Sequence, residues 1–154
     1  MSSFTTPLII TPLSDGRNFK LIEEFDYDVG VLGSGDTIHV PKGFVTDFAS
    51  IPHVPIALLG LVAVFLGNWL GNIWLSILGA CIIFCIVQLP NAGKYGKAAV
   101  LHDRIYQTHS RTRREADSIF KEAMLVSGTL PITAFVIWLA VRLFGFWAWR
   151  KFNA

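Results

Sequence analysis

Charged residues are scarce in this sequence, and a long central stretch has none. Asp, Glu, Lys and Arg make up 16% of the 154 residues, whereas about a quarter is usual for a soluble domain. From Phe48 to Gly93 none of these four residue types occurs. A surface helix of a soluble protein keeps a polar face, so the absence of charge excludes an ordinary surface helix here. We therefore predict that residues 54–88 insert into a membrane.

Glycine and asparagine near the middle of this stretch indicate a turn. Residues 67–72, with the sequence GNWLGN, have the composition of a turn, and they divide the stretch into arms of residues 54–69 and 72–88. A full crossing takes about 20 residues, so each arm is short for one. We predict a helical hairpin that is transmembrane in a thinned bilayer or re-entrant, and a single tilted span is the alternative.

Cysteine is also scarce, which excludes a disulfide-rich domain. The two cysteines, Cys81 and Cys85, both lie in the apolar stretch, four residues apart. That spacing places them on one helix face, where we expect packing rather than a disulfide framework or a metal pair. The first residues lack the basic region and long apolar core of a secretory signal.

The charges that are present are divided unevenly. Residues 1–50 carry three basic and seven acidic side chains, and residues 94–154 carry ten basic and four acidic ones. Lys94, Lys97 and Arg104 closely follow the apolar stretch, so the positive-inside rule places both polar parts on the cytoplasmic side of a bacterial inner membrane. The basic side chains do not alternate with base-stacking aromatics, so we expect no nucleic acid partner.

Outside the apolar stretch, the N-terminal part is typical of β-structure. NFKLIEEFDYDV and VLGSGDTIHVPKGFV read as strands, with Gly-Ser-Gly-Asp as a hairpin turn. The remainder is typical of helices. We predict one helix over residues 94–109 and a second over residues 112–126, which Thr112 and Glu115 begin as a capping box. Pro131 begins a third.

These elements predict an α+β fold. We expect a small β-rich N-terminal part, a helical hairpin and a C-terminal helix to form one domain of residues 1–53 and 89–154. The inserted membrane hairpin of residues 54–88 interrupts that domain.

The helix predicted over residues 94–109 carries polar side chains among apolar ones. His102 and Tyr106 are four residues apart and share a face, and a short loop would bring Asp117 opposite them. An acid that accepts one imidazole N–H leaves the other nitrogen free to act as a base. His102, Asp117 and Tyr106 are thus candidate catalytic residues, and Asp103 is a candidate Ca²⁺ ligand. Alternatively, they form a buried polar network that ties the helices together.

The segment before the apolar stretch supplies further candidates. We expect Asp47 or Ser50 beside His102 as a ligand or polar partner, and a triad of Ser50, His102 and Asp117 is conceivable. The alternative is that the polar side chains of this segment cap a turn.

Five motifs occur in order along the chain. They are GFVTDFASIP at 43–52, P-x-x-G-K-Y at 90–95, AAVLHDRIY at 98–106, TRREADSIF at 112–120 and VRLFGFWAW at 141–149. Over residues 20–150 the chain resembles an uncharacterised family of phage and prophage proteins, a domain of unknown function. The resemblance implies no activity. The first two motifs are close together in that family, so the apolar stretch is a departure.

The helical hairpin also resembles phospholipase A2, locally. There a helix carries H-D-x-x-Y and an antiparallel helix carries an Asp. The resemblance implies that His102 is the base, Asp103 the Ca²⁺ ligand, and Tyr106 and Asp117 supporting hydrogen-bond partners. The flanking cysteines and the Y-x-G-x-G calcium loop are absent.

Together these features predict a membrane-anchored, phage-associated hydrolase that uses Ca²⁺ and acts on phospholipid. Its expected partners are the lipid bilayer, a phospholipid substrate and other phage proteins. The alternative is a non-enzymatic phage membrane protein, in the virion, in lysis or in host interaction, whose His-Asp-Tyr network is structural.

Overall fold

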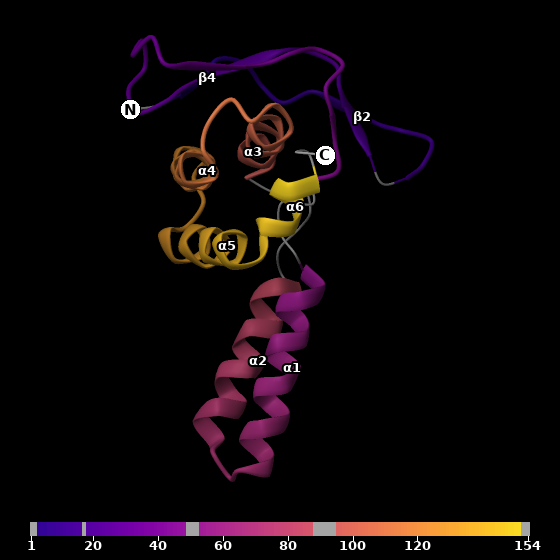
Figure 1. Ribbon diagram of the computed structural model, residues 1–154, viewed down its shortest axis with the longest axis vertical. Coiled ribbons are helices and arrows are strands. Elements are labelled where there is room, and N and C mark those ends of the chain that lie inside the picture. Colours follow the sequence, from indigo (N-terminus) through magenta and orange to yellow (C-terminus); the bar gives the residue numbers. More distant parts are fainter. Residues whose placement is uncertain (1–2, 17, 49–52, 88–94, 152–154) are drawn as a thin grey trace. The chain divides into compact units, whose positions relative to one another are not determined.

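The computed structural model of the chain describes residues 3–16, 18–48, 53–87 and 95–151 (Figure 1). The chain divides into two compact units, which are Met1–Ile51 with Lys94–Ala154, and Pro52–Gly93. The first unit contains two small antiparallel sheets and four helices, and the second contains two helices, within the described ranges. The predicted α+β fold class is confirmed.

Six short strands form the two sheets. One sheet has the order β1-β4-β5 and the other β2-β3-β6. Their bounds are Ser3–Phe4 for β1, Ile10–Pro12 for β2, Phe19–Leu21 for β3, Phe25–Asp28 for β4, Thr37–Val40 for β5 and Val45–Thr46 for β6. Buried side chains alternate with half-buried ones along β4 and with exposed ones along β5, as expected for strands with one face on the core.

The helices of the first unit begin and end at local sequence signals. They are α3 (Gly96–Thr108), α4 (Arg113–Val126), α5 (Pro131–Phe144) and α6 (Phe146–Lys151). Thr112 accepts a hydrogen bond from the backbone N–H of Glu115, and the Glu115 side chain accepts one from the Thr112 N–H. The predicted capping box is therefore confirmed, and Pro131 begins α5 as predicted. The strands lie on one side of α3 and α4, and α5 lies on the other (Figure 1).

The core of this unit joins strands of both sheets to α3, α4 and α5. One polar side chain, His102, is among its largest fully buried members. The others are Leu21, Phe25, Tyr27, Val40, Val100, Leu101, Ile105, Phe120, Met124, Ile137 and Val141. Side chains of the strands and of the helices thus pack in one apolar interior. This packing holds the hairpin of α3 and α4 in place.

The second unit is a helical hairpin of α1 (His53–Trp69) and α2 (Ile73–Val87). Its helices approach closely at glycines. A Cβ added to Gly79 would lie 2.5 Å from the carbonyl oxygen of Gly60 and 2.7 Å from the backbone nitrogen of Val64. Only glycine permits such an approach of two backbones.

The prediction that this hairpin anchors the protein in a membrane is wrong. Within the described ranges, no helix has both the length and the apolarity that a membrane crossing requires. α1 has 17 residues and α2 has 15, so at 1.5 Å per residue each extends about 22–26 Å, less than the ~30 Å hydrocarbon core. The placement of the polar parts on the cytoplasmic side of a bacterial inner membrane depended on that anchor, and it is withdrawn as well.

Candidate functional site

A buried polar network joins α3 to α4. The imidazole Nε2 of His102 lies 3.1 Å from Oδ1 of Asp117, and the Tyr106 hydroxyl donates to the same oxygen at 2.6 Å. These three side chains have at most 3% of their surface exposed. The structure thus brings together the three residues that the helical spacing had selected.

Two arginines complete the network, and the sequence analysis missed Arg142. Arg142 of α5 donates from Nη1 to Oδ2 of Asp117 at 2.9 Å. The Nε of Arg113 lies 3.9 Å from the same oxygen, and its Nη2 donates to the carbonyl oxygens of Val141 and Arg142. The signal for Arg142 was a single positive charge inside an otherwise apolar helix. One carboxylate therefore connects α3, α4 and α5.

In this network the Asp117 carboxyl group is ionised and the Tyr106 phenol is neutral. Burial by itself would raise the pKa of Asp117, but hydrogen bonds from His102, Arg142 and Tyr106 outweigh burial and the pKa is lowered. Burial raises the pKa of Tyr106, and the hydrogen bond to the Asp117 carboxylate and its charge raise it further. Asp117 is therefore an ionised acceptor, and Tyr106 remains a donor.

A pH dependence of stability follows. The pKa of Asp117 is lower in the folded state than in the unfolded chain, so its carboxylate stabilises the fold above the unfolded value of about 4. That stabilisation is lost as pH falls through the folded value. Urea unfolding at several pH values below about 5 should show a shallower slope of unfolding free energy against pH for Asp117→Asn than for wild type. Glu23→Gln, an exposed control, should keep the wild-type slope, and equal slopes for all three proteins would contradict this assignment.

The network is closed to a substrate. The His102 ring lies between aromatic rings, with its centroid 4.0 Å from that of Tyr106 and 4.6 Å from that of Phe120. Only 2% of the His102 surface is exposed. The prediction of a membrane-anchored hydrolase is wrong, because no described helix could supply the anchor and a buried imidazole gives an ester no access. The alternative prediction, a non-enzymatic phage membrane protein, is wrong for the same reason, because no described helix could supply its membrane anchor.

Asp103 belongs to a different contact. Its carboxylate accepts a hydrogen bond from the Thr46 hydroxyl, and that hydroxyl oxygen accepts one from the backbone N–H of Phe48. Phe48 has a φ of 53°, which is rare for a bulky residue. The Thr46–Asp103 contact thus joins the first motif to α3. Asp47 is exposed, and Ser50, with the triad built on it, lies outside the described residues.

The calcium site at Asp103 stays a prediction. Within the parts of the chain that the structure describes, no three His, Cys, Asp or Glu side chains are grouped so that they could hold a metal ion. One Asp103 oxygen already accepts from Thr46.

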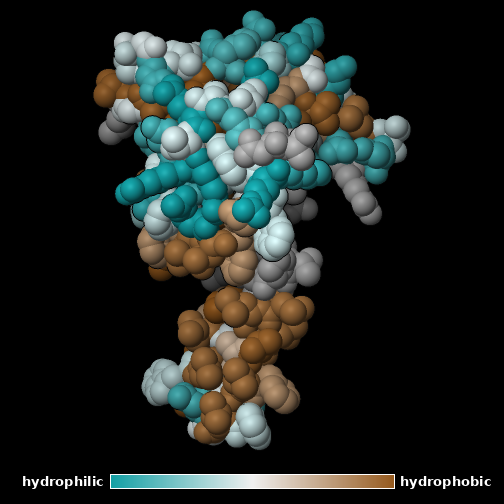
Figure 2. Space-filling view, viewed as in Figure 1, coloured by the Kyte–Doolittle hydropathy of each residue, from teal (hydrophilic) through white to brown (hydrophobic). Residues whose placement is uncertain are grey.

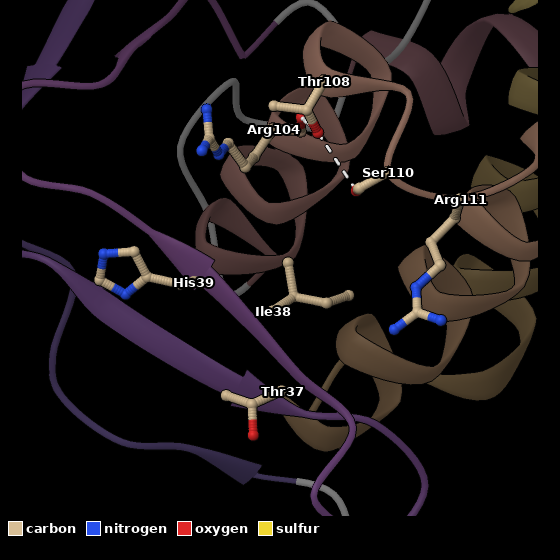
Figure 3. A pocket seen from close by; sticks show the side chains of 7 residues that line it. All are labelled: Thr37, Ile38, His39, Arg104, Thr108, Ser110 and Arg111. Atoms are coloured by element: carbon tan, nitrogen blue, oxygen red, sulfur yellow. Dashed lines mark hydrogen bonds between the residues drawn. The ribbon is translucent and has the colours of Figure 1, made fainter.

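A second polar site is a cavity between β5 and the start of the α3–α4 turn (Figure 3). Its volume is about 230 Å³. Arg104 and Arg111 lie on either side of Ile38 (Figure 3). The complete lining is Thr37, Ile38, His39, Arg104, Thr108, Ser110 and Arg111. It therefore combines two guanidinium groups, an imidazole and three hydroxyls, with no carboxylate.

The two arginines and the histidine of this pocket differ in their partners. Arg111 pairs with Asp36, and Nδ1 of His39 lies 2.6 Å from Oδ1 of Asp26. The Arg104 guanidinium lies 5.8 Å from the centroid of the Phe44 ring and has no carboxylate partner among the described residues. The sequence analysis missed this site, because its residues come from a strand and a helix end far apart in the chain.

One protein family matches this chain. Its model carries the description "Protein of unknown function (DUF1353)" and matches residues 19–65 and 79–141. The unmatched residues 66–78 lie within the hairpin of α1 and α2. No curated protein and no solved structure matches. None of these comparisons supports a phage origin or a likeness to phospholipase A2.

Proposed function

The chain belongs to this family of unknown function, and we propose that its α+β unit is a binding module that holds a small anionic group in the pocket beside Arg104. The family match over residues 19–65 and 79–141 confirms the resemblance to a domain of unknown function, without its phage and prophage origin. The observation that carries the proposal is the Arg104 guanidinium, which lines a cavity without a carboxylate partner among the described residues.

The chemistry of the lining favours an anion. A guanidinium offers several N–H donors in a planar fork that matches carboxylate and phosphate oxygens. Arg111 adds a second fork, and the Ser110 hydroxyl adds a donor that rotates to suit a ligand. The hydroxyls of Thr37 and Thr108 already donate, to Asp28 and to the Arg104 carbonyl oxygen. Asp36 already neutralises Arg111 in part, and Nδ1 of His39 already has Asp26 as its partner. An anionic ligand would therefore gain most from Arg104.

The size of the pocket limits the ligand. Sites for drug-sized molecules measure about 300–1,000 Å³, and this cavity measures about 230 Å³. It fits one phosphate, sulfate or carboxylate group with a few further atoms, and a whole nucleotide exceeds it. The ligand is thus a small anion, or one anionic group of a larger molecule that extends outside the pocket.

The buried network supports this site by positioning it. The Asp117 carboxylate connects the helices on both sides of the α3–α4 turn and also binds Arg142 of α5. This arrangement fixes the turn from which Ser110 and Arg111 reach the cavity. In this proposal His102, Asp117 and Tyr106 are structural, and no bond of the ligand is cleaved.

Titration with inorganic phosphate tests the proposal. A hydrogen bond to a charged group contributes about 1.5–3 kcal/mol, so Arg104→Gln should weaken phosphate binding roughly 10-fold or more. Isothermal titration calorimetry at low ionic strength measures the dissociation constant of phosphate. Arg114→Gln makes the same change of charge at an exposed position outside the pocket and should bind like wild type. Equal weakening by both variants, or no binding by wild type, would contradict the proposal.

A further inference from the structure

The hairpin of α1 and α2 exposes large apolar side chains on most of its surface. Figure 2 shows apolar residues over much of its length. Phe65 is 70% exposed, Trp69 76% and Trp74 77%. The other large exposed apolar residues here are Leu58, Leu59, Leu61, Val62, Leu66, Leu70, Ile73, Ile77 and Leu78. Single exposed apolar residues are common, but a continuous surface of this kind marks an interaction site.

The hairpin has almost no core of its own. Among residues 57–83, whose side-chain exposure the structure describes, the buried positions are Gly60, Gly67 and Gly79. The two helices contact each other at these glycines, where the side chains of Val64, Ile82 and Ile83 pack, and most of the other large side chains stay exposed. An apolar helix surface must be buried against another element to be stable in water.

We propose that the hairpin of a second copy of this chain covers this surface, so that two hairpins form a four-helix arrangement. The hairpin carries no Asp, Glu, Lys or Arg, so it offers nothing to a charged partner. A second copy presents the same uncharged surface, and a two-fold axis makes such a surface self-complementary. Four short apolar helices then share one interior, as in helical bundles.

The available area is sufficient for such a dimer. A stable interface buries about 800 Å² on each partner. Fully burying an aromatic side chain removes about 150–250 Å² from water, so Phe65, Trp69 and Trp74 alone expose on the order of 400 Å². The nine aliphatic side chains named above supply the remainder. The area argument therefore permits a dimer even if one side of each hairpin stays uncovered.

Two polar groups near the tip of the hairpin have partners within it. The Asn72 side chain accepts a hydrogen bond from the backbone N–H of Leu75 at 3.2 Å. The Ser76 hydroxyl lies 3.5 Å from the carbonyl oxygen of Val64 and from Oδ1 of Asn68. The Asn72 side-chain oxygen and the Ser76 hydroxyl would therefore keep these partners if the apolar surface were buried.

Sedimentation equilibrium of the full chain without detergent tests the dimer. The expected mass is twice the 17.1 kDa of one chain. Leu61→Asp combined with Phe65→Asp places two carboxylates on the surface and should weaken dimerisation at least 100-fold. Val31→Asp combined with Leu32→Asp changes two exposed apolar residues of the other unit and should leave the dimer intact. Circular dichroism of each variant checks its folding.

A second measurement guards against a variant that does not fold. In the Cys85→Ser chain, the exposed Cys81 accepts a donor or an acceptor dye. Mixing the two labelled populations should produce energy transfer that unlabelled chain abolishes by competition. A monomer in both measurements overturns the proposal, and so does a mass that rises with concentration without a stable dimer. A dimer that the double Asp variant leaves unchanged overturns it as well. The same holds for a monomer that co-sediments with phosphatidylcholine vesicles.

Discussion

Replacement of Asp117 by Ala is expected to lower the free energy of unfolding by about 3–5 kcal/mol, the usual cost of removing one partner from a buried ion pair. The carboxylate accepts from His102, Tyr106 and Arg142, so its removal leaves several donors without an acceptor. Urea unfolding followed by circular dichroism measures the change. Because Asp117 on α4 binds residues of both α3 and α5, no local rearrangement replaces all of its contacts.

Two further variants are the controls for this prediction. Asp117→Asn keeps the shape and one carbonyl acceptor, and should cost less than Asp117→Ala. Glu23→Ala removes an exposed carboxylate and should change the free energy of unfolding by no more than about 0.5 kcal/mol. A loss below about 1 kcal/mol for Asp117→Ala would show that the network does not hold α3, α4 and α5 together.

Replacement of Phe120 by Ala is expected to cost about 3–5 kcal/mol, the typical range for a buried Phe. The Phe120 side chain is fully buried, and its ring stacks on the His102 imidazole, with 4.6 Å between the centroids. The cavity would remove the contact that keeps His102 in place and would admit water to Asp117. Thermal and urea unfolding measure the effect.

Phe120→Leu is the matched control for this prediction. It retains most of the apolar volume but loses the aromatic stack, so its cost should be clearly smaller than that of Phe120→Ala. Phe135→Ala, at an exposed aromatic position of α5, should have little effect. Equal losses for Phe120→Ala and Phe135→Ala would contradict the assignment of Phe120 to the core.

Local signals allowed much of the helical part to be predicted. Thr112 and Glu115 define the start of α4 through contacts three residues apart, and Pro131 defines that of α5, so neither depends on distant contacts. The convergence of His102, Tyr106 and Asp117 was also accessible, because an i,i+4 pair and a short turn restrict the geometry strongly. The division of the strands into two sheets was not, since pairings such as that of β3 with β6 join distant segments.

The membrane prediction failed for a different reason. The sequence analysis placed the turn near the middle of the stretch and found each arm short for a crossing, but it allowed for short arms through a thinned bilayer or a re-entrant hairpin. The turn at residues 70–72 divides the stretch into helices of 17 and 15 residues. The pocket beside Arg104 could not be predicted from the sequence either, because only tertiary packing brings His39 of β5 to Arg104 of α3.

Nuclear magnetic resonance of the ¹⁵N-labelled chain during a titration with inorganic phosphate tests the central claim most directly. The claim predicts saturable shifts of the Arg104 Nε–Hε signal and of the backbone N–H signals of Ser110 and Arg111. The same signals should stay unchanged in Arg104→Gln, apart from the side chain that is lost. Shifts confined to exposed positions such as Arg114 and Arg150, or the absence of any saturable shift, would contradict the assignment of this pocket as an anion site.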